Sequence, residues 1–150
     1  MSKELRVVER WRTAELESAQ AERGALERAA RQRESARDLV QAKLVDAQSF
    51  VRERLAGGDP LSPEALRQFV AFASLQQAEL DAAQAAVEAS RASCEAAHGI
   101  VVGRFEALSV VQRLSRRRAV EASRELERAA QARLDEQALS RLARGNTNEE

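Results

Sequence analysis

The chain has little of what breaks or kinks a helix. Its 150 residues contain two prolines, Pro60 and Pro63, and both lie in one short stretch, LAGGDPLSPEAL, over residues 55–66. Two of the six glycines, Gly57 and Gly58, stand in the same stretch. Because proline and glycine are the residues that end helices most effectively, the sequence predicts uninterrupted helices on either side of a single turn.

Residues that favour strands or large globular cores are also scarce. There is no tyrosine, one tryptophan and four phenylalanines, whereas 44% of the residues are hydrophobic and 32% are charged. Alanine, leucine, glutamate, arginine and glutamine dominate, and all of them are good helix formers. This composition predicts an all-α fold in which each helix buries one apolar stripe and exposes a charged face.

Other absent features indicate the cellular compartment and exclude some classes of partner. Cys94 is the only cysteine, which excludes an internal disulfide and fits a reducing compartment. No apolar run reaches the roughly 18 residues that span a bilayer, and the N-terminal MSKELRVVERW lacks the apolar core of a secretory signal. Basic and acidic residues balance at 24 each, so no net field draws the chain to nucleic acid or membranes. We expect a cytoplasmic protein that neither spans a membrane nor binds nucleic acid.

Residues for metal binding or catalysis are equally few. Cys94 and His98 are four apart, and on one helix face both could reach one metal ion. A zinc site needs three or four ligands, and the chain has no second cysteine or histidine. The sequence also has no GxxxxGK[ST] phosphate loop. We expect no enzymatic activity, no cofactor and no metal, with Cys94 filling a helix seam.

The stretch around the prolines predicts where one helix ends and the next begins. Gly57 and Gly58 supply left-handed backbone, and Pro60 prevents continuation. Ser62 is placed to cap a second helix that has Pro63 at its first position. We expect a first helix over about 3–56, a loop over 57–62, a second helix over about 63–143 and a disordered tail over 145–150. Residues 1–144 would then form a single hairpin domain.

Apolar residues recur at alternating steps of three and four in both predicted helices. The seam positions of the first helix are 16, 19, 23, 26, 30, 33, 37, 40, 44, 47 and 51, and those of the second are 66, 69, 73, 76, 80, 83, 87, 90, 94, 97, 101, 104, 108, 111 and 115. This spacing is typical of coiled coils, and the short loop favours pairing of the two seams. We expect a long antiparallel coiled-coil hairpin in which the second helix is longer and continues beyond its partner after Arg116.

Two glycines inside the second predicted helix need an explanation. Gly99 and Gly103 are four residues apart, and each costs about 1 kcal/mol relative to alanine in a helix. Close approach of the facing helix is one explanation. A flexible point, or a place where the backbone of a partner comes near, is the other.

The candidate partner-binding residues lie at the two ends of the predicted hairpin. The run RLSRRR, residues 113–118, holds four arginines, and no acidic residue occurs from 107 to 120, which favours an acidic protein surface as partner. Trp11 falls off the first seam, and two roles stay open for it: packing on the second helix, or anchoring an interface as a residue type enriched at hot spots. Near the bend, Phe50 and Phe72 fall off the seams and Phe69 falls on one.

The segment VVQRLSRRRAVEASRELERAAQARLDEQALSRL resembles the C-terminal end of the FliJ/YscO family of flagellar export and type III secretion stalk proteins. In that family a patch rich in leucine and arginine, matched by Leu114 with Arg116–Arg118, precedes an amphipathic run. An acidic pair ahead of alanine follows, matched by Asp135, Glu136 and Ala138. The length of the chain and its longer second helix are similar across nearly the whole sequence, although Ser115 interrupts the patch and the family's usual tyrosines are absent.

The resemblance implies the central stalk of a flagellar or virulence-related secretion system. Such a stalk stands in the pore of a hexameric secretion ATPase, promotes its assembly and activity, and links it to the export gate. We assign the ATPase contact to Trp11, Arg113, Leu114, Arg116, Arg117 and Arg118, and the gate contact to Phe50, Phe69 and Phe72. Two other classes stay open: an export chaperone that grips unfolded proteins, and a self-associating coiled-coil scaffold.

Overall fold

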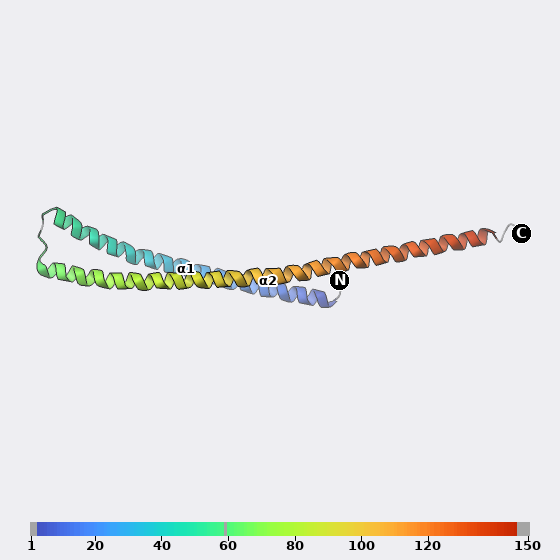
Figure 1. Cartoon of the computed structure of the whole chain (residues 1–150), viewed down its shortest axis with the longest axis horizontal. Coiled ribbons are helices and arrows are strands. Elements are labelled where there is room, and N and C mark those ends of the chain that lie inside the picture. Colours follow the sequence, from blue (N-terminus) through green and yellow to red (C-terminus); the bar gives the residue numbers. More distant parts are fainter. Residues whose placement is uncertain (1–2, 59, 147–150) are drawn as a thin grey trace. The chain divides into compact units, whose positions relative to one another are not determined.

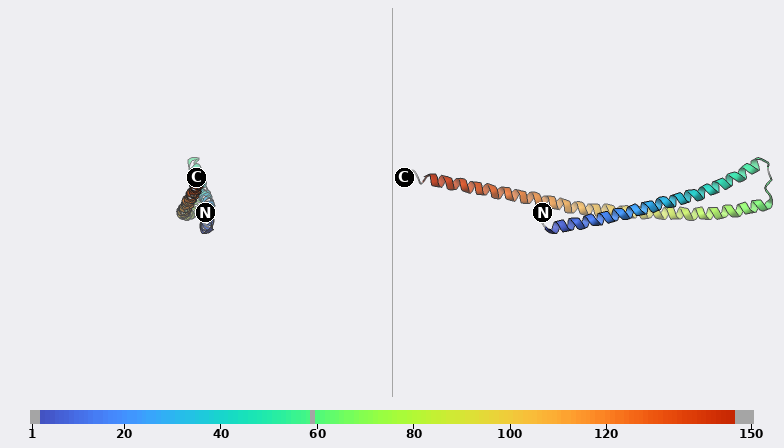
Figure 2. Two further views of the ribbon diagram at one scale, coloured as in Figure 1. Left: turned by 90° about the vertical axis from the view of Figure 1, so that its right-hand side faces the viewer. Right: turned by 180° about the vertical axis from the view of Figure 1, so that it is seen from behind.

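The computed structural model describes residues 3–58 and 60–146, with side chains described as far as position 142. These residues form two helices, α1 (Lys3–Ala56) and α2 (Pro63–Asn146), and no strand (Figures 1 and 2). The predicted all-α fold with a longer second helix is confirmed. Within the described part of the chain, no helix combines the length and hydropathy needed to cross a bilayer.

The C-terminal end of α1 is closed by one glycine rather than two. The amide of Gly57 donates to the carbonyl oxygen of Glu53 at 2.9 Å, which is still a helical hydrogen bond. Gly58 has a φ of 72° and is the residue that adopts the left-handed conformation. The prediction of left-handed backbone at both glycines is therefore wrong for Gly57.

The N-terminus of α2 is capped by Ser62. The Ala65 amide donates to Ser62 Oγ at 3.1 Å, and the Leu66 amide donates to the Ser62 carbonyl oxygen at 3.0 Å. Pro63 occupies the first helical position, where its missing N–H removes no helical hydrogen bond. The predicted N-cap is confirmed.

Replacing Ser62 by alanine is expected to destabilise the start of α2. The variant removes the acceptor of the Ala65 amide, and loss of such a cap costs about 1 kcal/mol. Urea unfolding followed by circular dichroism should show this loss for Ser62→Ala and not for Ser62→Asp, whose carboxylate accepts the same hydrogen bond. Equal stability of wild type and Ser62→Ala would contradict a stabilising cap.

The C-terminal end of α2 lies beyond the predicted position. The helix continues to Asn146, about three residues past the expected end near residue 143, and includes residues 145 and 146 of the expected tail. Gly145 does not stop the helix, because Gly58 is the only described glycine with the positive φ that closes one. The rest of the predicted tail, 147–150, lies outside the described residues.

Packing divides the chain into two units. Unit 1 contains residues 3–16 of α1 and 104–146 of α2, and unit 2 contains the described residues of 17–103. The expected single hairpin domain over 1–144 stays a prediction.

In unit 2 the buried side chains follow the predicted seams. The α1 seam positions of this unit are buried or half-buried except Arg33, and those of α2 are buried or half-buried except Leu66. Val87 is the most deeply buried large side chain, at 2% exposure. Arg33 Nη1 donates to Ser90 Oγ, and Arg91 forms an ion pair with Glu34 at 2.9 Å between Nη2 and Oε1. These contacts join α1 to α2 through the thin, alanine-rich seam.

Polar residues interrupt the seam of unit 2 at two levels. Gln76 is buried, and its Nε2 donates to Glu79 Oε2 at 3.1 Å, while no described group bonds to its Oε1. Ser90 is also buried and donates to the carbonyl oxygen of Ala86 at 2.9 Å while accepting from Arg33. Buried polar groups of this kind cost stability but can fix the alignment of paired helices.

In unit 1, α1 and α2 contact each other through a short seam and one carboxylate. Leu16, Leu108 and Ser115 are buried. The Glu15 carboxylate accepts from Arg12 Nη1 at 2.9 Å and from Arg104 Nη1 at 2.6 Å, so it connects α1 to α2. Every side chain described after Ser115, from 116 to 142, is exposed.

The two glycines inside α2 are not explained by tight packing. A Cβ atom placed on Gly99 or on Gly103 would meet no atom within 4 Å. Close approach of the facing helix, one of the two predicted explanations, is therefore wrong. The boundary between the two units in α2 falls directly after Gly103.

Candidate protein-binding surfaces

The basic run of unit 1 carries positive charge that the protein does not neutralise itself. Arg113, Arg116, Arg117 and Arg118 are all exposed. Arg113 donates to the carbonyl oxygen of Ser109 at 3.3 Å, a contact that leaves its charge unpaired. Among the described residues no ion pair involves Arg116, Arg117 or Arg118, whereas Arg104 in the same unit pairs with Glu15. This part of α2 can therefore attract an acidic partner.

The helical repeat sorts these arginines onto two faces. At about 100° per residue, Arg113, Arg116 and Arg117 fall within an arc of about 100°, and Arg124 falls within the same arc. Val120 lies at the centre of this arc and is exposed, and a shallow hollow is lined by Arg116, Arg117, Val120, Glu121 and Arg124. We name the four arginines with Val120 the arginine arc.

Val120 and Arg124 were missed when the sequence was considered alone. The signal was present, since residues 113, 117, 120 and 124 are separated by steps of four, three and four, which places them along one side of a helix. Arg124 has no ion pair among the described residues. Val120 and Arg124 stand outside the contiguous run RLSRRR, so the run alone does not include them.

The remaining predicted ATPase-contact residues lie elsewhere in unit 1. Arg118 is about 150° from the centre of the arginine arc and neighbours Leu114, four residues earlier, which is also exposed. Trp11 is 56% exposed, and the Arg12 guanidinium lies 4.6 Å from its ring centre. The six predicted residues therefore do not form one continuous surface.

The position of Glu9 shows which side of α1 carries Trp11. A hollow at the end of the unit 1 seam is lined by Glu9, Gln112, Ser115, Arg116 and Ala119, so Glu9 borders the side of α2 that carries Arg116. Trp11 is two residues later, which turns it by about 200° around α1. Trp11 is accessible to a partner on a different side from the arginine arc.

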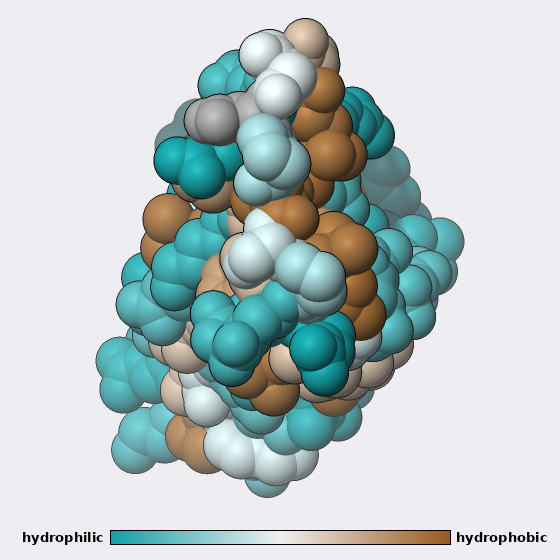
Figure 3. Space-filling view, turned by 90° about the vertical axis from the view of Figure 1, so that its left-hand side faces the viewer, coloured by the Kyte–Doolittle hydropathy of each residue, from teal (hydrophilic) through white to brown (hydrophobic). Residues whose placement is uncertain are grey.

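The end of unit 2 where α1 joins α2 is apolar at its surface. Phe50 is 57% exposed and Phe72 is 42% exposed, whereas Phe69 is half-buried in the seam. Figure 3, which looks onto this end, shows hydrophobic side chains reaching the surface at several places between polar ones. We name the exposed large apolar residues here the bend-end patch: Phe50, Leu55, Leu66, Val70, Phe72 and Leu75.

Charge is sparse on the α2 side of the bend-end patch. Residues 68–78 of α2 contain no charged side chain, although most of them are exposed. The Arg54 guanidinium lies 5.3 Å from the Phe50 ring centre, which partly covers that ring. Depletion of charge around exposed aromatic and aliphatic side chains is typical of the core of a protein–protein interface.

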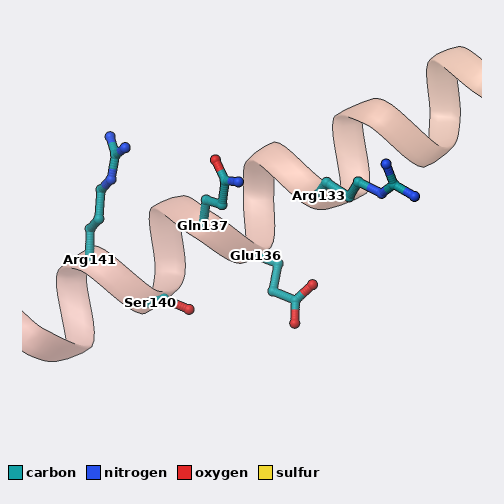
Figure 4. A pocket seen from close by; sticks show the side chains of 5 residues that line it. All are labelled: Arg133, Glu136, Gln137, Ser140 and Arg141. Carbon is teal, nitrogen blue, oxygen red and sulfur yellow. The ribbon is translucent and has the colours of Figure 1, made fainter.

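Side chains suited to a small ligand do not converge in the described part of the chain. Cys94 is half-buried at its seam position, and no group of three or more histidine, cysteine, aspartate and glutamate side chains could hold a metal ion among the residues described. Another shallow hollow is lined by Arg133, Glu136, Gln137, Ser140 and Arg141. Figure 4 shows that these side chains come from one helix and point in different directions.

The two candidate surfaces are helix faces. The arginine arc lies on α2 in unit 1, and the bend-end patch lies at the junction of the two helices in unit 2. Comparison with protein-family models, curated proteins and solved structures finds no match for the chain.

Proposed function

We propose that this chain is the central stalk of a bacterial type III secretion or flagellar export apparatus. In this role it binds the hexameric export ATPase in the cytoplasm, promotes its assembly and activity, and connects it to the export gate. The proposal combines the resemblance of the C-terminal third to the FliJ/YscO family with the charge and exposure of α2.

The architecture we propose for this role is an antiparallel coiled-coil hairpin. Three contacts support it, namely Arg33 with Ser90, Glu34 with Arg91 in unit 2, and Glu15 with Arg104 in unit 1. Within unit 1, Glu15 pairs with Arg104, and Glu9 lines a hollow with Gln112 and Ser115, so the α2 number rises as the α1 number falls, which is the order that antiparallel pairing requires. The steps of three and four between buried positions support coiled-coil packing.

The observation that carries the ATPase contact is the unneutralised positive charge of the arginine arc. The side chains of the arc are all exposed, so a partner can approach them without displacing a packed element. Exposed charge of one sign accelerates and orients association with a surface of the opposite sign. The gate contact we propose is the bend-end patch, with Phe50 and Phe72 as its exposed aromatic residues, together with Phe69, which is half-buried in the seam.

Charge reversal in the basic run is expected to abolish stimulation of the ATPase. The purified export ATPase from the same source would be assayed with wild type and with the triple variant Arg116→Glu, Arg117→Glu and Arg118→Glu. Each reversal replaces attraction by repulsion, so binding should weaken about tenfold or more. The readouts are ATP turnover and the ATPase concentration needed for half-maximal binding.

A triple variant of equal charge change provides the control. Arg28, Arg31 and Arg52 are exposed on α1 in unit 2, away from the basic run, and their reversal should leave stimulation close to wild type. Turnover that does not respond to wild-type protein would refute the stalk proposal. Suppression of client aggregation without ATPase binding would instead favour an export chaperone, and concentration-dependent oligomers without ATPase binding would favour a scaffold.

A further inference from the structure

The seam of unit 1 continues along α2 past Ser115, the last buried position of this helix among the described side chains. Up to Ser115 its positions are buried or half-buried, including Leu108 at the centre. Beyond Ser115, five small or apolar residues keep to the same side of the helix within an arc of about 120°, and all are exposed: Ala119, Ala122, Leu126, Ala130 and Leu134. We name these five residues the uncovered stripe.

The uncovered stripe is bordered along one edge by the arginine arc. Arg116 lies about 80° from Leu126 around the helix, and Val120 lies about 120° from it. The first hollow beside the stripe is lined by Ser115, Arg116 and Ala119, so the apolar and basic surfaces meet there. An occupant of the stripe would therefore contact the arginines as well.

We propose that the uncovered stripe and the arginine arc together bind an amphipathic helix of a partner protein, whose apolar face is edged by acidic residues. The apolar face of that helix continues the packing that α1 provides up to Ser115. Its carboxylates lie against Arg116, Arg117 and Arg124, which have no ion pair among the described residues. This recognition of a helix by an apolar face with charged edges is a common mode of peptide binding.

Charge complementarity favours such a partner over a second copy of the chain. On the arginine side of α2 between residues 113 and 134, Glu121 and Glu127 stand among the four arginines, so positive charge predominates. A second copy placed face to face would thus bring more positive than negative charge to the four arginines, whereas an acidic helix would bring negative charge only. The arginines of the second copy would also repel those of the first.

The binding can be tested without the export ATPase, so its failure is distinguishable from failure of the proposed function. The probe is a synthetic helical peptide of about six turns with a leucine and alanine stripe edged by glutamates, labelled for fluorescence anisotropy. A second peptide with the same stripe and lysine edges tests the charge, and polyglutamate tests the stripe. The full-length protein should bind the glutamate-edged peptide best.

Adjacent residues supply matched variants. Arg117→Glu, in the arginine arc, should weaken binding on the order of fivefold, whereas Arg118→Glu, about 100° away, should leave it nearly unchanged. Leu126→Asp should weaken binding more than tenfold, because it places a charge in the centre of the apolar contact. Leu126 and Leu139 are similarly exposed at 72% and 67%, but Leu139 lies off the stripe, so Leu139→Asp should have little effect.

Several outcomes would overturn the proposal. Equal binding of the glutamate-edged and lysine-edged peptides would show that the arginines do not select the partner. Polyglutamate binding as well as the helical peptide would show that the stripe contributes nothing. A wild-type dimer in sedimentation that Leu126→Asp dissociates and the peptide does not would show that a second copy covers the stripe.

Discussion

Val87→Asp is expected to unfold unit 2 or to destabilise it by about 3 kcal/mol or more. Val87 is the most deeply buried large side chain, and an aspartate there would place an unpaired carboxylate in a seam with no described partner for it. The seam is thin and rich in alanine, so few other contacts would compensate. Urea unfolding monitored by far-ultraviolet circular dichroism measures the change in the free energy of unfolding.

Val70→Asp is the matched control for this substitution. It makes the same chemical change in the same helix and the same unit, but Val70 is 55% exposed. A substitution at such a surface position changes stability by about 0.5 kcal/mol or less. Similar losses for both variants would show that residue 87 is not in the core of the free protein.

The double variant Gly99→Ala and Gly103→Ala is expected to stabilise the protein by about 2 kcal/mol. Both glycines are helical, neither has a positive φ, and a Cβ atom at either position meets nothing within 4 Å. Each substitution therefore gains the helix propensity of alanine, about 1 kcal/mol, without a steric cost. The denaturant midpoint should rise while the dependence on denaturant stays the same.

Gly58→Ala should destabilise the protein, in contrast to the Gly99 and Gly103 variant. Gly58 also has open space around its Cβ position, but its φ of 72° is strained for alanine, so a loss of about 1 kcal/mol is expected. The two results together separate steric room from backbone conformation. A loss of stability in the Gly99 and Gly103 variant would show that these positions need glycine for a reason other than space.

The helices and their junction could be predicted because local chemistry determines them. Ser62 and Pro63 specify the start of α2 through capping and a preset φ, and the three-four spacing identifies the buried side. The end of α2 could not be predicted from composition, because a glycine near a C-terminus is compatible both with a left-handed cap and with one more helical turn. The backbone decides between them, and at Gly145 the helix continues.

The candidate surfaces were predicted less completely than the fold. The arginines were recognised as a run, but a run of adjacent residues winds around a helix, so Arg117 and Arg118 face different directions. Trp11 was grouped with the arginines because both were expected at the same end of the hairpin. Along α1, Trp11 lies about 200° around the helix from Glu9, which borders Arg116, so Trp11 and Arg116 face different sides. Phe50 and Phe72 were placed correctly off the seams, since the period of the seam alone decides which aromatic residues are left outside.

The polar contacts between α1 and α2 in unit 2 restrict how the two helices can be aligned. If α1 were displaced by seven residues along α2, the apolar seam residues would again face each other, so apolar packing alone would tolerate the displacement. The same shift would separate Arg33 from Ser90 and Glu34 from Arg91, leaving a buried hydroxyl without its donor. A pairing displaced by one heptad would thus be less stable than the native one, so these contacts select a single register among similar apolar alternatives.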